Sequence, residues 1–382
     1  MPSIFVRHLL EPSGCTQTVH PANEKVRIVK RKIYFIAPFP PPVTGAATMA
    51  EELSETLTQS GSANIDRLNV SMTKLSGSLA LYALKSLRLL RAVVRVLCGA
   101  YHYLIVVPPG GPMLALYIPI LAAARLRGVK ILFDHHNYSY INVPTKMMAS
   151  AAWLMGSQGI HLFLSKKMGQ QFSNIYYTNN WRASSNWGRL SFAAREARVT
   201  SEQPLTLGFF SNVSLEKGID TFLMLLEEAV DRGTPVRAVV AGGMDGDACK
   251  LVESAIERGL PVEALGPLYG AAKAEFFECC DILALPTRYK NEAEPLVLIE
   301  GQIAGCLVIA TDVGTIAETI VPECGFTWPC ATFSENAADL IDKLANRVEN
   351  LRRDRKRLAQ ISSQRASDER AAWKQRIAEL IT

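Results

Sequence analysis

Two glutamates, Glu292 and Glu300, stand eight residues apart on either side of a point where a helix can start. Pro295 suits the first turn of a helix, where the missing amide hydrogen costs nothing. Glu292 would then lie on the preceding loop, and Glu300 roughly a turn and a half into the helix. The start of a helix offers an anion free backbone N–H groups and the positive end of the helix dipole. A phosphate there, with one acid on each side, is the arrangement of a nucleotide-sugar site.

A lysine at another expected helix start is the next candidate for anion binding. Lys217 directly precedes Gly218, where a helix over 217–230 is expected. A cation in this position is unfavourable for the helix dipole, by about 0.3–1 kcal/mol. A bound diphosphate would reverse that balance, so we interpret Lys217 as a phosphate-binding residue. The alternative is an exposed lysine without a ligand.

Two polar turns in the first half of the chain follow expected strands. One contains Thr44 and Gly45 and leads into a helix. A glycine there lets the backbone approach a ligand, although every such turn favours small residues. The other turn runs from Asp134 to Asn137, and α/β sheets bind ligands at the carboxyl ends of their strands. A single histidine is more often structural, but this polar cluster indicates a ligand site.

The sequence does not predict a metal site. No second pair of His or Cys residues near His135 and His136 has zinc-ligand spacing. Asp245 and Asp247 form a D-x-D pair, but they follow an apolar run and fit an ordinary turn better. These residues therefore give no reason to expect a metal ion.

Together these segments resemble a known family. The segment from Glu292 to Glu300 resembles the E-x7-E motif of retaining glycosyltransferases of family 4, which have the two-domain GT-B fold. Residues 210–220 resemble the family's phosphate-binding segment, and 280–286 resemble the strand that leads to its nucleotide site. Residues 311–314 resemble the turn after the E-x7-E helix. The similarity covers about 190–340, while the first half of the chain matches more loosely.

The resemblance implies a role for each candidate residue. Glu300 would bind the donor ribose hydroxyls, and Glu292 would contact the transferred sugar and the charge developing at its anomeric carbon. A histidine, His136 in preference to His135, would lie near the transferred sugar. The residues that we assign to the donor are Thr44, Gly45, Asn212, Lys217, Arg288 and Leu296. The residues assigned to the acceptor or sugar side are His135 and Asn137.

The chain departs from the family in two places. Ala, Glu and Pro at 293–295 replace the Gly or Ser, Phe and Gly that the family usually has. The proline lacks an N–H and the glutamate adds negative charge. Asn212 stands where the family often has an arginine, so we expect the remaining positive charge from Lys217 together with Arg288 or Lys290.

Short apolar strands alternate with helices, which is typical of parallel sheets covered on both faces. Strands are expected at 33–37, 65–70, 103–107, 129–133, 205–210, 236–241, 281–285 and 306–310. Helices are expected at 46–57, 77–97, 112–126, 217–230, 247–258, 271–279 and 295–304. The predicted fold is α/β of the GT-B type, with two Rossmann-like parallel-sheet domains facing across a cleft.

Domain boundaries follow from the same pattern. We expect a poorly ordered lead-in at 1–31, an acceptor-binding domain at 32–190 and a polar linker at 191–204. A nucleotide-sugar-binding domain would occupy 205–365. The helical pattern at 366–382 has no strand after it, and in the resembled family this helix crosses back to the first domain.

Composition sets limits on the class of protein. The 382 residues are 48% apolar and 20% charged, which suits two globular domains. The longest apolar run, 112–124, is too short to span a membrane, and the first residues lack the layout of a signal peptide. Eight cysteines without C-x-x-C spacing indicate reduced thiols and a cytoplasmic protein.

The net charge of +5 hides a division between the two halves. Residues 1–200 carry 22 Lys and Arg against 8 Asp and Glu, a net +14, whereas 201–382 carry 19 against 28, a net −9. This asymmetry points to an anionic partner, either a membrane surface or a phosphate-bearing acceptor. Nucleic acid is not supported, because no stacking-aromatic or recognition-helix pattern accompanies the charge. Arg88, Arg91 and Arg95 share one helix face, which is either membrane-facing or simply solvated.

The resemblance thus implies a retaining, metal-independent glycosyltransferase of the hexosyltransferase type, with no cofactor besides its nucleotide-sugar co-substrate. It would move a sugar from a nucleotide-diphosphate-sugar to a glycan or lipid-linked acceptor, in cell-surface polysaccharide or glycolipid biosynthesis. We expect it in the cytoplasm or peripherally at the inner face of the membrane. Two alternatives stay open: another GT-B chemistry such as sugar-nucleotide epimerisation, and a degenerate protein that binds a glycan or partner.

Overall fold

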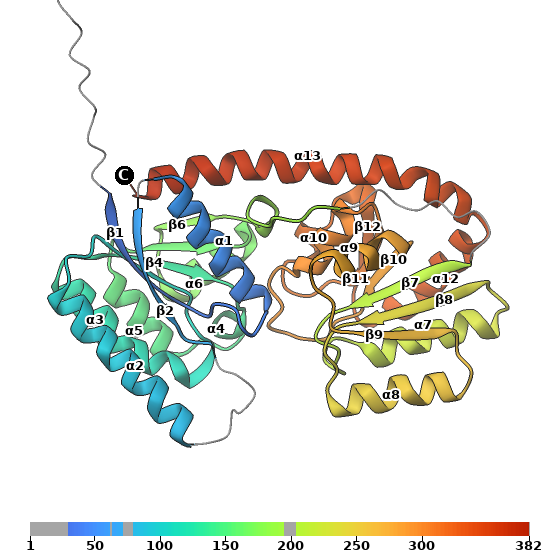
Figure 1. Ribbon diagram of the computed structural model, residues 1–382, viewed down its shortest axis with the longest axis horizontal. Coiled ribbons are helices and arrows are strands. Elements are labelled where there is room, and N and C mark those ends of the chain that lie inside the picture. Colours follow the sequence, from blue (N-terminus) through green and yellow to red (C-terminus); the bar gives the residue numbers. More distant parts are fainter. Residues whose placement is uncertain (1–29, 62, 72–78, 195–203, 382) are drawn as a thin grey trace, which may run out of the picture.

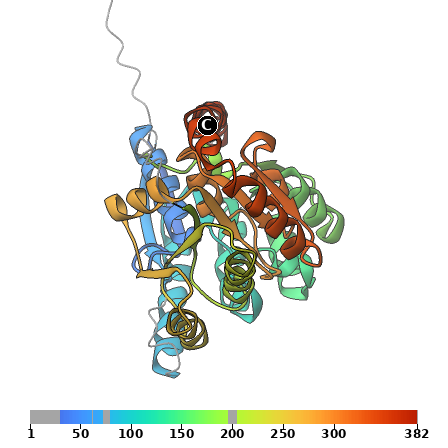
Figure 2. The same cartoon turned by 90° about the vertical axis from the view of Figure 1, so that its right-hand side faces the viewer.

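The computed structural model describes residues 30–61, 63–71, 79–194 and 204–381. It contains two α/β domains, each built on a six-stranded sheet in which the paired strands are parallel (Figure 1). The expected lead-in up to residue 29 and most of the expected linker, 195–203, lie outside the described residues. Turned by 90°, the molecule shows the second domain in front of the first (Figure 2).

The first sheet has the strand order β2-β1-β3-β4-β5-β6. Its strands are β1 Arg31–Ala37, β2 Ala63–Asn69, β3 Tyr103–Val106, β4 Lys130–His135, β5 Ile160–Phe163 and β6 Trp181–Ala183. The helices of this domain are α1 Gly45–Gln59, α2 Leu79–Cys98, η1 Gly111–Tyr117, α3 Ile118–Leu126, α4 Ser139–Asn142, α5 Lys146–Met155, α6 Lys166–Tyr176 and η2 Asn186–Gly188.

The second sheet has the order β12-β11-β10-β7-β8-β9. Its strands are β7 Leu205–Phe210, β8 Val236–Ala241, β9 Val262–Gly266, β10 Ile282–Leu285, β11 Leu307–Thr311 and β12 Gly325–Trp328. The remaining helices are α7 Ile219–Asp231, α8 Gly246–Glu257, α9 Gly270–Cys279, α10 Leu296–Ile303, α11 Ile316–Thr319, η3 Pro322–Cys324, α12 Phe333–Ala345 and α13 Val348–Ile381.

Strand β1 shows why its sequence is apolar without alternation. Tyr34 and Ile36 pack into a core with α2, α3, α5 and α6, whereas Ile33 and Phe35 pack on the opposite face with α1 and the end of α13. A strand covered on both faces needs apolar side chains at successive positions. The same helices that bury this strand therefore fix its carboxyl end, where the turn with Thr44 follows.

The long helix α13 joins the two domains. Leu351 near its start packs in the core of the second domain, and Trp373 and Ile377 near its end pack in the first. Figure 1 shows α13 lying along both domains. It begins at Val348, well before the expected position 366, because the helical sequence pattern before residue 366 continues without a break into the pattern after it.

One expected helix, 112–126, is divided in the structure. Residues Gly111–Tyr117 form a 3-10 helix, and α3 begins only at Ile118. Pro119 lies in the first turn of α3, where its missing N–H is tolerated. None of the helices in the described ranges is both long and apolar enough to cross a membrane. The seven cysteines in those ranges are free, and three of them, Cys280, Cys306 and Cys324, are buried.

Candidate active site

A cleft of about 450 Å³ lies between the domains and is lined by residues of both. The first domain contributes the start of α1 and the turn after β4, and the second contributes the ends of β7 and β8 and the start of α10. These are carboxyl ends of strands in the two sheets, where α/β folds bind ligands. The volume falls in the usual range for small-molecule sites, roughly 300–1,000 Å³.

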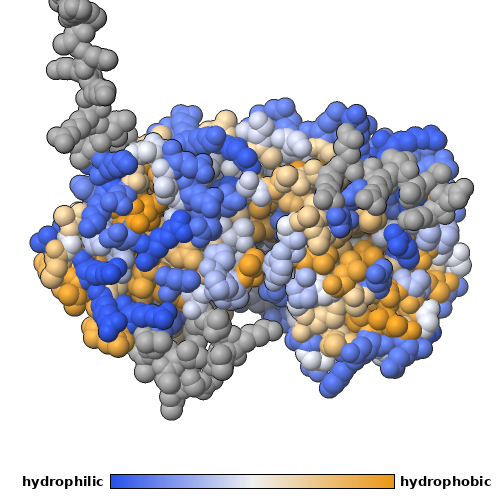
Figure 3. All heavy atoms as spheres, in the orientation of Figure 1, coloured by the Kyte–Doolittle hydropathy of each residue, from blue (hydrophilic) through white to orange (hydrophobic). Residues whose placement is uncertain are grey.

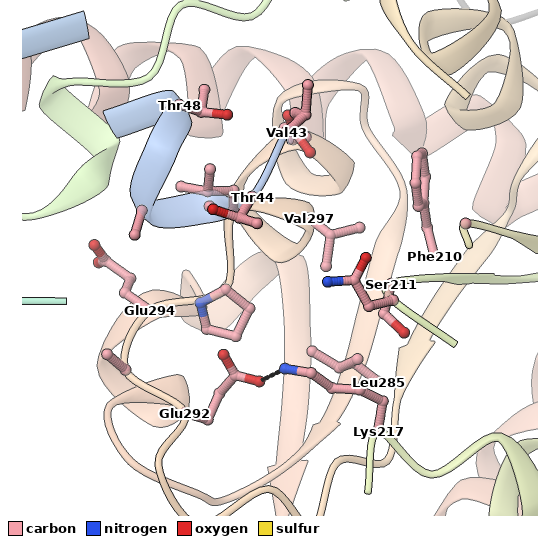
Figure 4. A pocket seen from close by; sticks show the side chains of 18 of the residues that line it. Val43, Thr44, Thr48, Phe210, Ser211, Lys217, Leu285, Glu292, Glu294 and Val297 are labelled. Carbon is pink, nitrogen blue, oxygen red and sulfur yellow. Dashed lines mark hydrogen bonds and ion pairs between the residues drawn. The ribbon is translucent and has the colours of Figure 1, made fainter. Parts of the chain in front are cut away.

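Glu292 and Lys217 meet inside this cleft. The Lys217 ammonium forms an ion pair with Glu292 Oε2, shown as the dashed line in Figure 4. Two glycines let the backbone reach this arrangement. Gly218 has φ +86°, and a Cβ on it would lie 2.0 Å from the Pro286 carbonyl oxygen; a Cβ on Gly314, at φ +62°, would lie 2.0 Å from Glu292 O. Both positions exclude other residues for steric reasons.

Glu300 forms a second acid–lysine pair deeper in the cleft. Its Oε1 accepts a hydrogen bond from Lys273 Nζ at 2.5 Å. Its Oε2 is buried and has no hydrogen-bond partner within the described part of the chain. Burial raises the pKa of Glu300, and the attraction of Lys273 opposes that rise. A buried acceptor without a partner is costly, so Oε2 is suited to a ligand hydroxyl.

The first domain places smaller polar groups across the cleft. Thr44 caps α1, since its Oγ1 accepts from Ala47 N at 3.2 Å, and Gly45 is the first residue of that helix. His136 lines the cleft and its Nε2 lies 3.0 Å from Asp134 Oδ2. Asn137 also lines it, with Oδ1 accepting from Ser139 N.

Asp134 lies behind His136 in a buried ion pair. Arg189 donates to both carboxylate oxygens, at 3.0 Å and 2.5 Å. Burial alone would raise the pKa of Asp134, but the charges of Arg189 and His136 outweigh it and hold that pKa well below its usual range. The Arg189 guanidinium also lies 4.6 Å from the ring centroid of Trp373 on α13. His136 is thus oriented by a carboxylate that stays ionised.

Comparison with known protein families gives a match to the second half of the chain. Residues 192–365 match the family Glycosyl transferases group 1. The match covers the second domain, which carries Lys217, Glu292 and Glu300. No curated protein sequence matches the chain.

Solved structures similar to the whole chain are GT-B glycosyltransferases, which confirms the predicted fold. Anabaena HepE in complex with UDP is 15% identical with a TM-score of 0.66, over 91% of this chain and 100% of that one. Sucrose-phosphate synthase from Thermosynechococcus elongatus is 14% identical with a TM-score of 0.65, over 92% and 100%. A glycosyltransferase from Rickettsia africae is 15% identical with a TM-score of 0.63, over 92% and 98%.

Nine of the eleven residues expected at the site line the cleft together. They are Thr44, Gly45, His136, Asn137, Asn212, Lys217, Glu292, Leu296 and Glu300. Arg288 does not line it: its guanidinium pairs with Asp220 at 2.9 Å and donates to Leu215 O at 2.7 Å. His135 is buried inside the first domain and, unlike His136, does not line the cleft.

The surroundings of His135 keep it neutral. Its Nδ1 lies 2.7 Å from the Tyr140 hydroxyl, and its Nε2 lies 2.9 Å from His161 Nδ1. Burial, together with His161, lowers the pKa of His135 well below the usual value. This histidine is part of the packed core of the domain and does not reach the cleft.

Three residues of the cleft were not singled out from the sequence, although two of them, Phe210 and Ser211, begin the segment 210–220 that resembles a phosphate-binding segment. Lys273 pairs with Glu300, and Phe210 and Ser211 line the cleft at the end of β7, as Figure 4 shows for the latter two. The Ser211 hydroxyl is buried without a partner in the described ranges. A lysine inside a helix pattern and a polar residue after a strand carry no distinguishing signal in one sequence.

Glu294 has a different position from the one expected. Its carboxylate accepts hydrogen bonds from Ser185 Oγ at 2.6 Å and from the backbone N–H of Asn186 at 2.5 Å. Burial raises its pKa to about 7, against the lowering effect of those two hydrogen bonds. Glu294 therefore ties the loop before α10 to the end of the first domain, instead of adding charge beside the Lys217–Glu292 pair.

The two aspartates considered as metal ligands lie at the start of α8, Asp245 as its N-cap and Asp247 in its first turn. Asp245 Oδ1 accepts from Ala248 N at 2.8 Å and caps α8. In the described ranges, no three His, Cys, Asp or Glu side chains are grouped so that they could hold a metal ion. The helix cap accounts for Asp245 without any ligand.

Proposed function

We propose that the protein is a retaining glycosyltransferase that uses a nucleotide-diphosphate-sugar donor and a glycan or lipid-linked acceptor. The observation that carries this proposal is the pair of lysine–glutamate contacts, Lys217–Glu292 and Lys273–Glu300, around the start of α10 in an interdomain cleft. The family match of the second domain supports it. So do the complexes of Anabaena HepE with UDP and with UDP-glucose, which share the fold.

The chemistry follows from what each group can offer. A diphosphate at the start of α10 would receive the Lys217 ammonium and the first backbone N–H groups of the helix. Glu292, released from Lys217, would face the positive charge that develops at the anomeric carbon. Glu300 Oε2 would accept from a ribose hydroxyl. Stabilising the leaving diphosphate and the cationic sugar in a partly closed cleft is the main catalytic contribution. We infer front-face attack by the acceptor, with retention.

We place the acceptor on the first domain and the enzyme at the cytoplasmic face of a membrane. The support is the net +14 of residues 1–200, which suits a phosphate-bearing or membrane-held acceptor. Cell-surface polysaccharide or glycolipid synthesis would supply such acceptors. Turnover that requires an acceptor separates a transferase from an epimerase, and donor binding without turnover would mark a binding protein.

We expect Lys217→Ala and Glu300→Ala each to weaken donor binding by roughly 10- to 100-fold, because each removes a hydrogen bond to a charged group. A thermal-shift screen of nucleotide-sugars identifies the donor, since a ligand that binds the folded state raises its melting temperature. Titration calorimetry then compares affinities. Arg288→Ala is the matched control, because its guanidinium pairs with Asp220 outside the cleft. Unchanged affinity in both test variants would remove Lys217 and Glu300 from the site.

We expect turnover to continue in EDTA. The Lys217 ammonium and the N–H groups at the start of α10 can neutralise a diphosphate without a divalent ion. The measurement is donor turnover with and without the chelator, after dialysis. Loss of turnover in EDTA, with recovery on adding Mg²⁺ or Mn²⁺, would show that the reaction needs a metal.

A further inference from the structure

One long segment of the first domain contains almost no acidic residues. Between Asp66 and Glu196 the sequence holds 15 lysines and arginines and one acidic residue, Asp134. Asp134 is buried against Arg189 and does not reach the surface. The helices α2, α3, α5 and α6 all fall in this segment and cover one face of the first sheet. Their outer surface is therefore positive without compensating acids, which favours an extended anionic partner.

Helix α2 adds an apolar stripe to this charge. Its buried face, with Leu89, Ala92 and Val96, packs on the sheet. On the outer side, exposed apolar residues recur at spacings of three and four, as Leu87, Leu90, Val94 and Leu97. Beside them the exposed arginines recur at the same spacing, as Arg88, Arg91 and Arg95. Leu90 and Val94 keep 60% and 56% of their surface exposed, and the spacing groups them with Leu87 and Leu97 into one apolar stripe instead of leaving them scattered.

Two further exposed apolar residues extend this surface beyond α2. Leu126 at the end of α3 is 78% exposed, and Trp153 on α5 is 70% exposed. The Arg125 guanidinium lies 5.3 Å from the Trp153 ring centroid. Helix α3 packs between α2 and α5, so the three helices form one continuous layer (Figure 1). Figure 3 shows hydrophobic residues along this outer end of the first domain, next to hydrophilic ones.

We propose that the outer face of α2, α3 and α5 docks on an anionic lipid bilayer and inserts Leu90, Val94, Leu126 and Trp153 into its interface. Parallel apolar and arginine stripes on one helix are the pattern of a helix lying in the interface plane. Tryptophan, with an apolar ring and a polar N–H, favours the same depth. The lipid-linked acceptor that a membrane-bound enzyme would use is part of the proposed function. The docking itself is inferred from this surface alone.

Insertion makes the attachment different from simple electrostatic attraction. Salt screens the arginines, so binding weakens as ionic strength rises. Buried apolar side chains are not screened, so part of the binding remains in high salt. If the partner were instead an acidic protein held to this face by charge alone, high salt would release it completely.

Sedimentation with phosphatidylcholine vesicles, with and without phosphatidylglycerol, tests the proposal on the full chain. We expect binding to the acidic vesicles only. The triple variant of Arg88, Arg91 and Arg95 to Glu should abolish it. Leu90→Ser with Val94→Ser should weaken it at least about tenfold and reduce the salt-resistant part, to which Leu126 and Trp153 still contribute. The control is Met224→Ser with Ile256→Ser in the second domain, where side chains of similar exposure, 63% and 45%, are changed.

Three results would overturn the proposal. The first is that the protein does not bind acidic vesicles at low salt. The second is that the α2 variants bind as well as the control variant. The third is that high salt releases all of the bound protein. Trp153→Phe provides a second measurement, because the change in tryptophan fluorescence on adding vesicles should be smaller in this variant. Donor affinity is measured without vesicles, so a failure of docking and a failure of the proposed function are seen separately.

Discussion

Replacing Arg189 by Met should lower the free energy of unfolding by about 3–5 kcal/mol, because it leaves the Asp134 carboxylate buried without its cation. Arg189 and Asp134 are both almost completely buried, with two hydrogen bonds between them. The variant also loses the contact of the guanidinium with the Trp373 ring, which holds α13 against the first domain. Urea denaturation followed by circular dichroism measures the loss.

The pH dependence checks the same cause. The folded pKa of Asp134 is depressed below the unfolded value of about 3.9. Its ionised form therefore stabilises the fold above that pH, and this stabilisation is lost as the pH falls toward the folded pKa. The difference between wild type and Arg189→Met should be largest at neutral pH and shrink as the pH falls, because burial without Arg189 raises the pKa of Asp134 and lets the variant protonate this carboxyl first.

A surface pair supplies the control for this experiment. Arg353 and Glu349 form an exposed pair on α13, with side chains 71% and 60% exposed. Arg353→Met should change stability by less than about 0.5 kcal/mol. Adding Asp134→Leu to Arg189→Met should recover part of the loss, since an apolar pair can replace a buried ion pair. Equal stability of Arg189→Met and Arg353→Met would contradict a stabilising role for the buried pair.

The parts of the site that sequence analysis predicted are those encoded locally. Pro295 and the apolar run after it determine where α10 starts, so Glu292 falls on the loop and Glu300 in the helix. Lys217 precedes the N-cap glycine of α7 for a similar reason. Strands β7 and β8 were predicted at their observed bounds because both are short, mostly apolar runs. The alternation of such runs with helices predicted the parallel sheets, and the GT-B arrangement of the two domains was implied by the family resemblance.

The parts that were missed depend on contacts far apart in the sequence. Glu294 meets Ser185 and Asn186 across more than one hundred residues, and no spacing pattern announces that contact. Arg288 was expected at the phosphate, but its guanidinium pairs with Asp220 at the start of α7. Strand β6 has only three residues, and β9 has few buried side chains, so neither has the apolar run by which strands were predicted.

The prediction with the largest effect on activity concerns Glu292. Glu292→Gln keeps the shape of the side chain but removes the negative charge that would face the developing cation on the sugar. We expect kcat to fall by about 100- to 1,000-fold, the usual cost of removing one electrostatic group from a preorganised site. The donor KM should change much less, because this charge acts mainly in the transition state. Initial rates over a range of donor concentrations separate the two parameters.

Glu294→Gln is the matched control, with the same chemical change two residues along the same loop. Its carboxylate faces Ser185 and Asn186, not Lys217. A Gln oxygen can still accept from the Asn186 N–H, while the new NH2 group can donate to the Ser185 hydroxyl oxygen. With a pKa of about 7, Glu294 is already partly protonated at neutral pH, and the substitution removes less charge. Glu294→Gln should therefore retain most of the wild-type kcat. If both variants lose kcat equally, the loss comes from the loop and not from the charge of Glu292. If Glu292→Gln raises KM with kcat unchanged, Glu292 only binds the donor.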